Sequence, residues 1–126
     1  MRVAVCQVNS RADRAANLAA ARDLLRRAAE AGADLAVLPE YVDYLGPTEG
    51  EPKAEPTDGE FASFFADAAR ELRMWVLAGS FHESGRRSLS SQNRGANGSS
   101  RASAVFRTGA RARYTSRVLE WARVNA

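Results

Sequence analysis

The chain has 126 residues, 45% of them hydrophobic and 26% charged, which is the composition of a globular protein with a modest core. Its single cysteine excludes an internal disulfide, and one cysteine with one histidine argues against a zinc site. No apolar run has the length of a membrane span or a signal peptide, so we expect a cytoplasmic protein. The net charge of +3 combines an acidic part, residues 1–83 with 14 acidic and nine basic side chains, and a basic part, residues 84–126 with nine arginines and one acid.

The first 39 residues predict a strand, a helix and a second strand. Residues 2–8 are a short valine-rich run that predicts a buried strand. Residues 17–31 are strong helix formers, and Gly32 follows them as a stop signal. The helix carries an apolar stripe at helical spacing, formed by Leu18, Ala21, Leu25 and Ala28. Residues 34–39 then predict a second buried strand that ends at Pro39.

This order of elements predicts a βαβ unit, in which a right-handed crossover joins two parallel strands. In open α/β sheets, ligands bind at the carboxyl ends of the strands. Glu40 follows the second strand directly, so its carboxylate is placed where chemistry is expected.

The rest of the chain predicts a second helix, further strands and a polar segment. A long loop is expected over 41–58, an amphipathic helix over 60–72 with Asp58 as its N-cap, and a third strand over 75–80. Residues 84–101 are rich in Ser, Gly, Arg and Asn and predict a flexible or disordered loop. Two further strands, 102–106 and 110–114, are expected to form a hairpin, and residues 115–126 are weakly helical.

Three segments resemble the carbon–nitrogen hydrolases of the nitrilase superfamily. The first is Val3-Ala-Val-Cys-Gln-Val with Asn17-Leu18 further on. The second, Gly32-Ala-Asp-Leu-Ala-Val-Leu-Pro-Glu-Tyr41, is similar to the family's glutamate motif almost residue for residue. The third is Phe65-Ala-Asp-Ala-Ala-Arg-Glu-Leu followed by Trp75-Val-Leu-Ala-Gly-Ser-Phe-His-Glu83. Together these segments cover residues 1–83.

The resemblance implies a fold and an activity. Members are α/β proteins with an α-β-β-α sandwich, of which this chain would hold an incomplete part, and they usually form homo-oligomers. They hydrolyse non-peptide carbon–nitrogen bonds in small amides, nitriles or N-carbamoyl compounds with a Glu-Lys-Cys triad. The cysteine attacks the substrate, the glutamate is the general base and the lysine stabilises the oxyanion. This mechanism needs no metal or organic cofactor.

Only one member of that triad has a counterpart in this sequence. Glu40 matches the general base, with Pro39 before it and Tyr41 after it. A gap-free match places Ser116 at the lysine position, and the single lysine, Lys53, lies outside the motif. The single cysteine, Cys6, has apolar neighbours and is interpreted as a core residue, because the nucleophile of the family lies further downstream. We therefore expect no turnover by this chain alone.

Residues 1–126 are accordingly expected to form one partial carbon–nitrogen hydrolase domain. Residues 1–83 match the family well, whereas 84–126 are diverged, basic, and expected to be disordered or the result of truncation or a frameshift. An alternative is a non-catalytic binding or regulatory module that pairs with intact subunits. Nucleic-acid binding by the basic segment ranks last, because its arginines follow no helical face and few aromatic residues lie between them.

Overall fold

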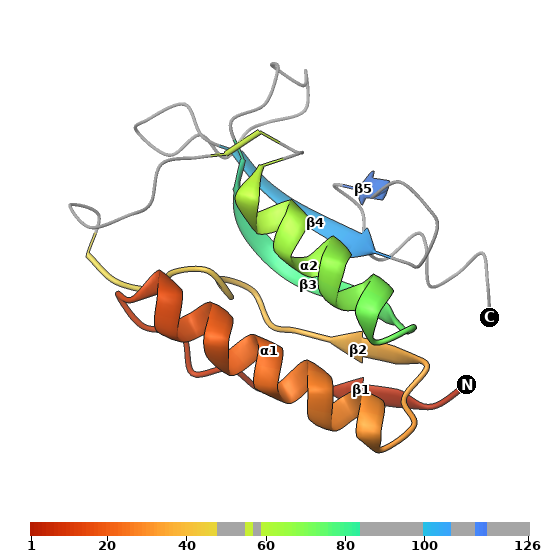
Figure 1. Cartoon of the computed structure of the whole chain (residues 1–126). Coiled ribbons are helices and arrows are strands. Elements are labelled where there is room, and N and C mark those ends of the chain that lie inside the picture. Colours follow the sequence, from red (N-terminus) through yellow and green to blue (C-terminus); the bar gives the residue numbers. More distant parts are fainter. Residues whose placement is uncertain (48–54, 57–58, 84–99, 107–112, 116–126) are drawn as a thin grey trace.

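The computed structural model describes residues 1–47, 55–56, 59–83, 100–106 and 113–115, which form one sheet and two helices (Figure 1). The strand order in the sheet is β1-β2-β3-β4-β5. The elements in chain order are β1 (Val3–Val5), α1 (Arg14–Glu30), β2 (Leu35–Val37), α2 (Glu60–Glu71), β3 (Trp75–Glu83), β4 (Ser100–Phe106) and β5 (Arg113–Thr115).

The first three strands are parallel, as the βαβ prediction requires. β1 pairs with β2 and β2 pairs with β3, while β4 and β5 are antiparallel to their neighbours. Because each new parallel strand is added on the same side of the previous one, crossovers of one hand bring both helices to the same face. Figure 1 shows α1 and α2 together on one face of the sheet. The α/β fold class is therefore confirmed.

Helix α1 begins three residues earlier than its composition predicted, because Asp13 caps it. The Asp13 carboxylate accepts a hydrogen bond of 3.0 Å from the backbone N–H of Ala16. The helix ends in a Schellman motif: Gly32 adopts a φ of 73°, its N–H donates to the carbonyl of Ala29, and the N–H of Ala33 donates to the carbonyl of Ala28. The predicted stop at Gly32 is confirmed.

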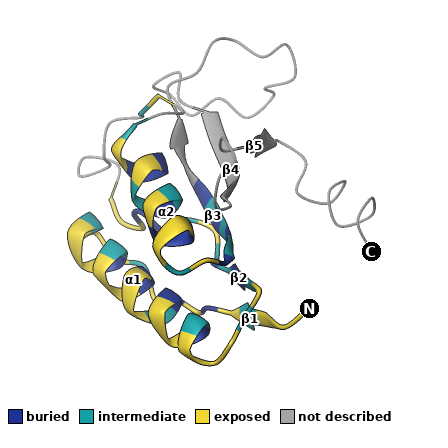
Figure 2. Cartoon of the chain, turned by 45° about the vertical axis from the view of Figure 1, so that its right-hand side comes forward, coloured by how far each residue is buried: buried dark blue, intermediate teal, exposed yellow. Residues whose placement is uncertain are grey.

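The core lies between the two helices and the inner face of the sheet (Figure 2). Ala21 and Leu25 of α1 are fully buried, as the predicted stripe requires, whereas Leu18 is only half-buried. Phe61 and Phe65 supply the large side chains of α2, with ring centroids 4.8 Å apart. The inner face of the sheet contributes small residues, Ala36, Val76 and Ala78, each with no exposed surface. Small residues there let the helices approach the strands closely.

The outer face of the sheet is also apolar but remains partly open. The strand register aligns two rows across β1, β2 and β3, namely Val3–Leu35–Trp75 and Val5–Val37–Leu77. Val3 is 46% exposed and Val5 is 81% exposed, and the other four residues are half-buried. The prediction that 2–8 is a buried strand was therefore wrong for Val3 and Val5: the regular strand is short, and both described helices lie on the opposite face.

The predicted elements beyond residue 72 were partly confirmed. The third strand is longer than expected and extends to Glu83. The predicted strand at 102–106 belongs to β4, which begins at Ser100, so the polar loop expected to reach residue 101 ends earlier. β4 and β5 pair as a hairpin would. The expected turn at 108–109 and loop residues 84–99 lie outside the described residues. Of the stretch 115–126, which was expected to be weakly helical, Thr115 belongs to β5 and the rest lies outside the described residues. Among the helices that the structure describes, none is long and apolar enough to cross a membrane.

Candidate active site

Glu40 lies just beyond the carboxyl end of β2, the strand between β1 and β3. The backbone N–H of Leu38 still donates to the carbonyl of Leu77 at 2.9 Å, so β2 and β3 remain in register almost up to the glutamate. Glu40 itself is exposed, and no described residue forms an ion pair or hydrogen bond with its carboxylate. The chain therefore presents this carboxylate at the end of the sheet where parallel α/β folds bind ligands.

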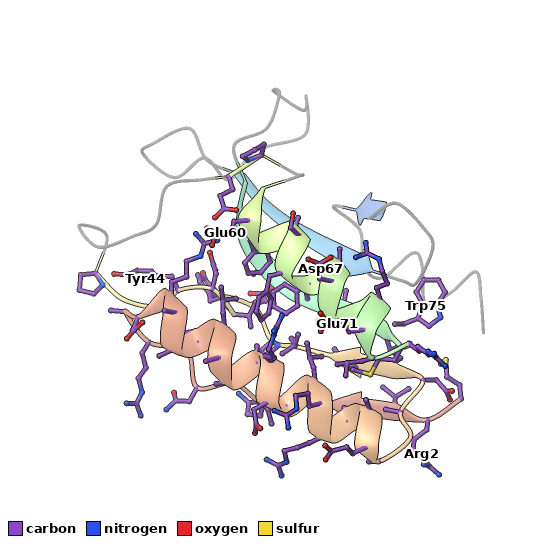
Figure 3. All side chains as sticks on the ribbon, viewed as in Figure 1. Arg2, Tyr44, Glu60, Asp67, Glu71 and Trp75 are labelled. Atoms are coloured by element: carbon purple, nitrogen blue, oxygen red, sulfur yellow. The ribbon has the colours of Figure 1, made fainter. Side chains whose placement is uncertain are left out.

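The segment that follows Glu40 runs along this same end of the molecule. Figure 3 shows Tyr44 near the start of α1, at the opposite end from Arg2, which precedes β1, and from Trp75, the first residue of β3. The Tyr44 hydroxyl donates to the carbonyl of Pro47 at 2.8 Å, and the Tyr44 side chain is 4% exposed. The buried tyrosine thus gives the first part of the predicted 41–58 loop a definite conformation.

Asn17 connects this segment to the loop that precedes α1. Its side-chain amide donates to the carbonyl of Asp43 at 2.9 Å and to the carbonyl of Arg11 at 2.8 Å, and its oxygen accepts from the N–H of Arg11 at 2.9 Å. The N–H of Leu45 adds a fourth contact, to the carbonyl of Arg11. Asn17 is 3% exposed, so these hydrogen bonds are formed away from water and hold both loops together.

The backbone on either side of Glu40 contacts β3. Tyr41 adopts a φ of 56°, which is unusual for a residue other than glycine, and its N–H donates to Oγ of Ser80 at 3.1 Å. On the other side of Glu40, the carbonyl of Pro39 lies against Gly79 so closely that a Cβ at Gly79 would be 1.8 Å from the carbonyl oxygen. Glu40 thus lies between two residues, Pro39 and Tyr41, that contact two consecutive residues of β3, Gly79 and Ser80.

Cys6 occupies the core, as the sequence predicted. It is 5% exposed and belongs to the core cluster, and its backbone N–H donates to the carbonyl of Val37 at 2.8 Å. Burial raises the pKa of the Cys6 thiol above its ordinary value, because the thiolate would lose its hydration. A thiol that holds its proton and is buried is a poor nucleophile. These properties support a structural role for Cys6.

The other positions considered for catalysis lie beyond what the structure describes. Lys53 and Ser116, the two residues considered for the family's lysine, are outside the described residues. In the described part of the chain, no group of three His, Cys, Asp or Glu side chains is placed to hold a metal ion. Of the triad positions, Glu40 is the one that lies among the described residues.

Sequence reasoning assigned no role to Asn17, Gly79 or Ser80, although all three lie in the segments that carry the family resemblance. The usable signal was a glycine inside a predicted strand, which often marks a bulge or a close approach of another backbone. A second signal was the spacing of Asn17, which lies four residues before Ala21 and so on the same side of the helix as the apolar stripe.

Comparison with known proteins identifies the family. The family model for carbon–nitrogen hydrolases matches residues 2–108. The chain is 41% identical over 85 residues to the deaminated glutathione amidases of Bos taurus and Homo sapiens, a match that covers 66% of this chain and 26% of each relative. It is 38% identical over 85 residues to a hydrolase of Mycobacterium tuberculosis, covering 68% of this chain and 30% of that protein. The chain thus spans about a quarter of the length of the amidases that it matches.

Solved structures show the same fold. A carbon–nitrogen hydrolase superfamily protein of Xanthomonas campestris, with an arsenic adduct in its active site, superposes with a TM-score of 0.69 and 23% identity, over 90% of this chain and 39% of that one. The NitFhit protein of Caenorhabditis elegans gives a TM-score of 0.60 at 23% identity, over 82% of this chain and 24% of that one. With a family match over most of its length and this fold, the chain belongs to the carbon–nitrogen hydrolase family.

Proposed function

We propose that Glu40 is the general base of a carbon–nitrogen hydrolase active site, to which this chain contributes the glutamate-bearing part. The observation that carries the proposal is the position of Glu40: an exposed carboxylate at the carboxyl end of β2, within the segment matched by the family model. A base must reach the proton that it removes, and an exposed carboxylate on a backbone held from both sides meets that need.

The substrate class that fits best is an amide. The bovine and human relatives are named deaminated glutathione amidases, and they match 85 residues of this chain at 41% identity. In the Glu-Lys-Cys mechanism that the family resemblance implies, a carboxylate base first accepts the proton of the attacking thiol and later activates water. Glu40 is suited to both steps, whereas the thiol has to come from a cysteine other than the buried Cys6.

We further propose that this chain is one layer, or part of one, of an α-β-β-α sandwich. The support is the pattern of the sheet: its inner face is covered by both helices, while two apolar rows lie on the outer face, with Val5 81% exposed. A sheet with two apolar faces needs cover on both, and a second sheet packed about 10 Å away supplies it. The family resemblance also implies assembly into homo-oligomers.

It follows that the 126-residue chain by itself should not turn over an amide. The sequence places Ser116 where the family has its lysine, and its only cysteine is in the core. When catalytic residues act as a unit, loss of the nucleophile costs about as much as loss of all of them. Glu40 alone has no acyl-enzyme step to assist.

A chimera tests the role of Glu40. The 85 matched residues of this chain replace their counterpart in the bovine amidase, and hydrolysis of deaminated glutathione is measured. Glu40→Gln should lower kcat by about 10²–10⁴-fold, the range for loss of a general base. Glu30→Gln, at an exposed glutamate in the last turn of α1, is the matched control and should leave kcat unchanged. A chimera that tolerates Glu40→Gln would favour a non-catalytic module.

The isolated chain provides the second test of the proposal. The purified chain and its Glu40→Gln variant are compared for hydrolysis of amides and N-carbamoyl compounds. We expect no turnover by either protein. Turnover that Glu40→Gln abolishes would contradict the proposed inactivity and would require a nucleophile among residues interpreted above as structural.

The second layer can be tested with a charge on the outer face. Val5→Lys should change the free energy of unfolding of the isolated chain by less than about 0.5 kcal/mol, because Val5 is 81% exposed there. In the chimera the same substitution would bury a charge between two sheets, and it should lower the free energy of unfolding by about 2 kcal/mol or more. Ala19→Lys, at an exposed position of α1, is the control. Equal effects in both proteins would contradict a second layer at this face.

A further inference from the structure

The strand β3 is irregular at the point where it passes Glu40. The pairing of β3 with β4 joins Leu77 to Val105 and Ser80 to Ser103, so two residues of β3 oppose one residue of β4. Gly79, within this bulge, adopts a φ of 66°. Bulges with a glycine in the left-handed region bend a strand and change the direction of neighbouring side chains, and they are frequent beside active sites.

The bulge brings two groups of β3 to the backbone around Glu40. The hydroxyl of Ser80, a residue 6% exposed, accepts the hydrogen bond from the N–H of Tyr41. Gly79 leaves room for the carbonyl of Pro39, which any side chain at that position would displace. One contact lies before the glutamate in the sequence and the other after it.

Tyr41 needs such support because of its backbone conformation. A φ of 56° is costly for a residue with a Cβ and persists only where the surroundings impose it. The peptide bond that joins Glu40 to Tyr41 carries the N–H that Ser80 binds, so the same hydrogen bond sets the direction in which the chain leaves Glu40. Loss of the hydroxyl would remove this restraint from the residue adjacent to the carboxylate.

We propose that Gly79 and Ser80 are positioning residues for Glu40, acting through the backbone on either side of it. Ser80 holds the residue after the glutamate, and the missing side chain of Gly79 admits the residue before it. This inference rests on the proposed role of Glu40 as the base, and it adds to that role the means by which the carboxylate is directed. Neither residue contacts the reacting atoms in this arrangement.

The test uses the full chain and needs no turnover. NMR spectra of the isotopically labelled chain give the exchange rate of the Tyr41 amide, the HN–Hα coupling that reports its φ, and the ¹³C signal of the Glu40 carboxylate. Ser80→Ala removes the hydroxyl, Ser80→Thr retains it, and Ser63→Ala removes an exposed hydroxyl from α2 as the matched control. Amides of Leu25 and Val76 report on the buried core.

We expect Ser80→Ala to raise the exchange rate of the Tyr41 amide at least tenfold and to shift the Glu40 carboxylate signal, with the core amides unchanged. Ser80→Thr should retain the parent values of the Tyr41 amide and of Glu40, and Ser63→Ala should not alter them. The proposal is overturned if Ser80→Ala leaves Tyr41 and Glu40 unchanged, or if the core amides lose protection to the same extent, which would indicate general loosening. If Glu40→Gln leaves the kcat of the chimera unchanged, the role of Glu40 as the general base is refuted, whereas the backbone restraint by Ser80 is not affected by that result.

Discussion

The guanidinium of Arg14 forms an ion pair with the carboxylate of Glu55, and the same carboxylate accepts a hydrogen bond of 2.8 Å from the backbone N–H of Phe61. Glu55 therefore joins the first turn of α1 to the first turn of α2. The N-cap residue of α2 is Gly59, which has no side chain to accept a hydrogen bond from the first turn. Glu55 accepts one instead, which is the capping role that the sequence suggested for Asp58. Asp58 lies outside the described residues. A carboxylate at the N-terminus of α2 also interacts favourably with the positive end of the helix dipole.

Replacement of Glu55 should therefore destabilise the chain more than replacement of an ordinary surface acid. Glu55→Ala removes a cap and one partner of a partly shielded ion pair, and we expect a loss of about 1–2 kcal/mol in the free energy of unfolding. Glu71→Ala, at an exposed residue in the last turn of α2, should change it by less than about 0.5 kcal/mol. Urea denaturation measures both values, and equal effects would argue against the link between the helices.

Asn17 should be sensitive to any change of its amide. Asn17→Ala leaves the Arg11 and Asp43 backbone groups without their buried partner, which should cost about 1–3 kcal/mol. Asn17→Asp should be no milder, because a carboxylate cannot donate to either carbonyl. Hydrogen exchange of the Leu45 amide should accelerate in both variants. Asn9→Ala, at an exposed asparagine, serves as the control, and a similar loss there would contradict the role assigned to Asn17.

Gly79 and Gly32 form a matched pair for substitution by alanine. Both have a positive φ, of 66° and 73°, so each alanine variant bears the cost of the left-handed conformation, about 1–2 kcal/mol. At Gly32 the new Cβ meets only the guanidinium end of the Arg2 side chain, which can move aside by giving up its hydrogen bond to the carbonyl of Ala31. At Gly79 it meets the backbone carbonyl of Pro39. That overlap should add about 1–3 kcal/mol to the loss for Gly79→Ala. Thermal unfolding of the two variants gives the difference, and equal losses would show that the Pro39 contact is easily relaxed.

The Cys6 thiol should make the stability of the chain depend on pH only under alkaline conditions. Burial raises the pKa of this thiol in the folded state, so the unfolded chain gives up the proton first as the pH rises. Stability should be independent of this group below about pH 8, and should decrease as the pH rises past the ordinary thiol pKa of about 8.5. Cys6→Ala should remove that alkaline decrease, although it lowers stability at every pH by leaving a cavity.

Thiol reactivity tests the same burial directly. A disulfide reagent should modify Cys6 much more slowly in the folded chain than in urea, because the thiol is 5% exposed and keeps its proton. Rapid modification of the folded chain at neutral pH would contradict a core role and would reopen Cys6 as a nucleophile.

Local patterns in the sequence were sufficient to predict the helices, the parallel strands and the position of Glu40. The apolar stripe of α1, the stop at Gly32 and the valine-rich runs are patterns over a few residues. The hydrogen bonds of a helix join residues only four apart in the chain, so neighbouring residues are enough to predict it. Because Glu40 comes just after a predicted strand, its place at the end of the sheet follows from the order of elements alone.

Other features required the tertiary structure, because they join residues far apart in the chain. The hydrogen bond between Tyr41 and Ser80 spans 39 positions, and that between Asn17 and Asp43 spans 26. A valine-rich run is compatible with cover on one face of the sheet or on both, so only the tertiary structure showed that Val5 lies on the open face. Side-chain pattern determines which residues avoid water, whereas the packing of distant segments decides which surface covers them and in which direction Glu40 is held.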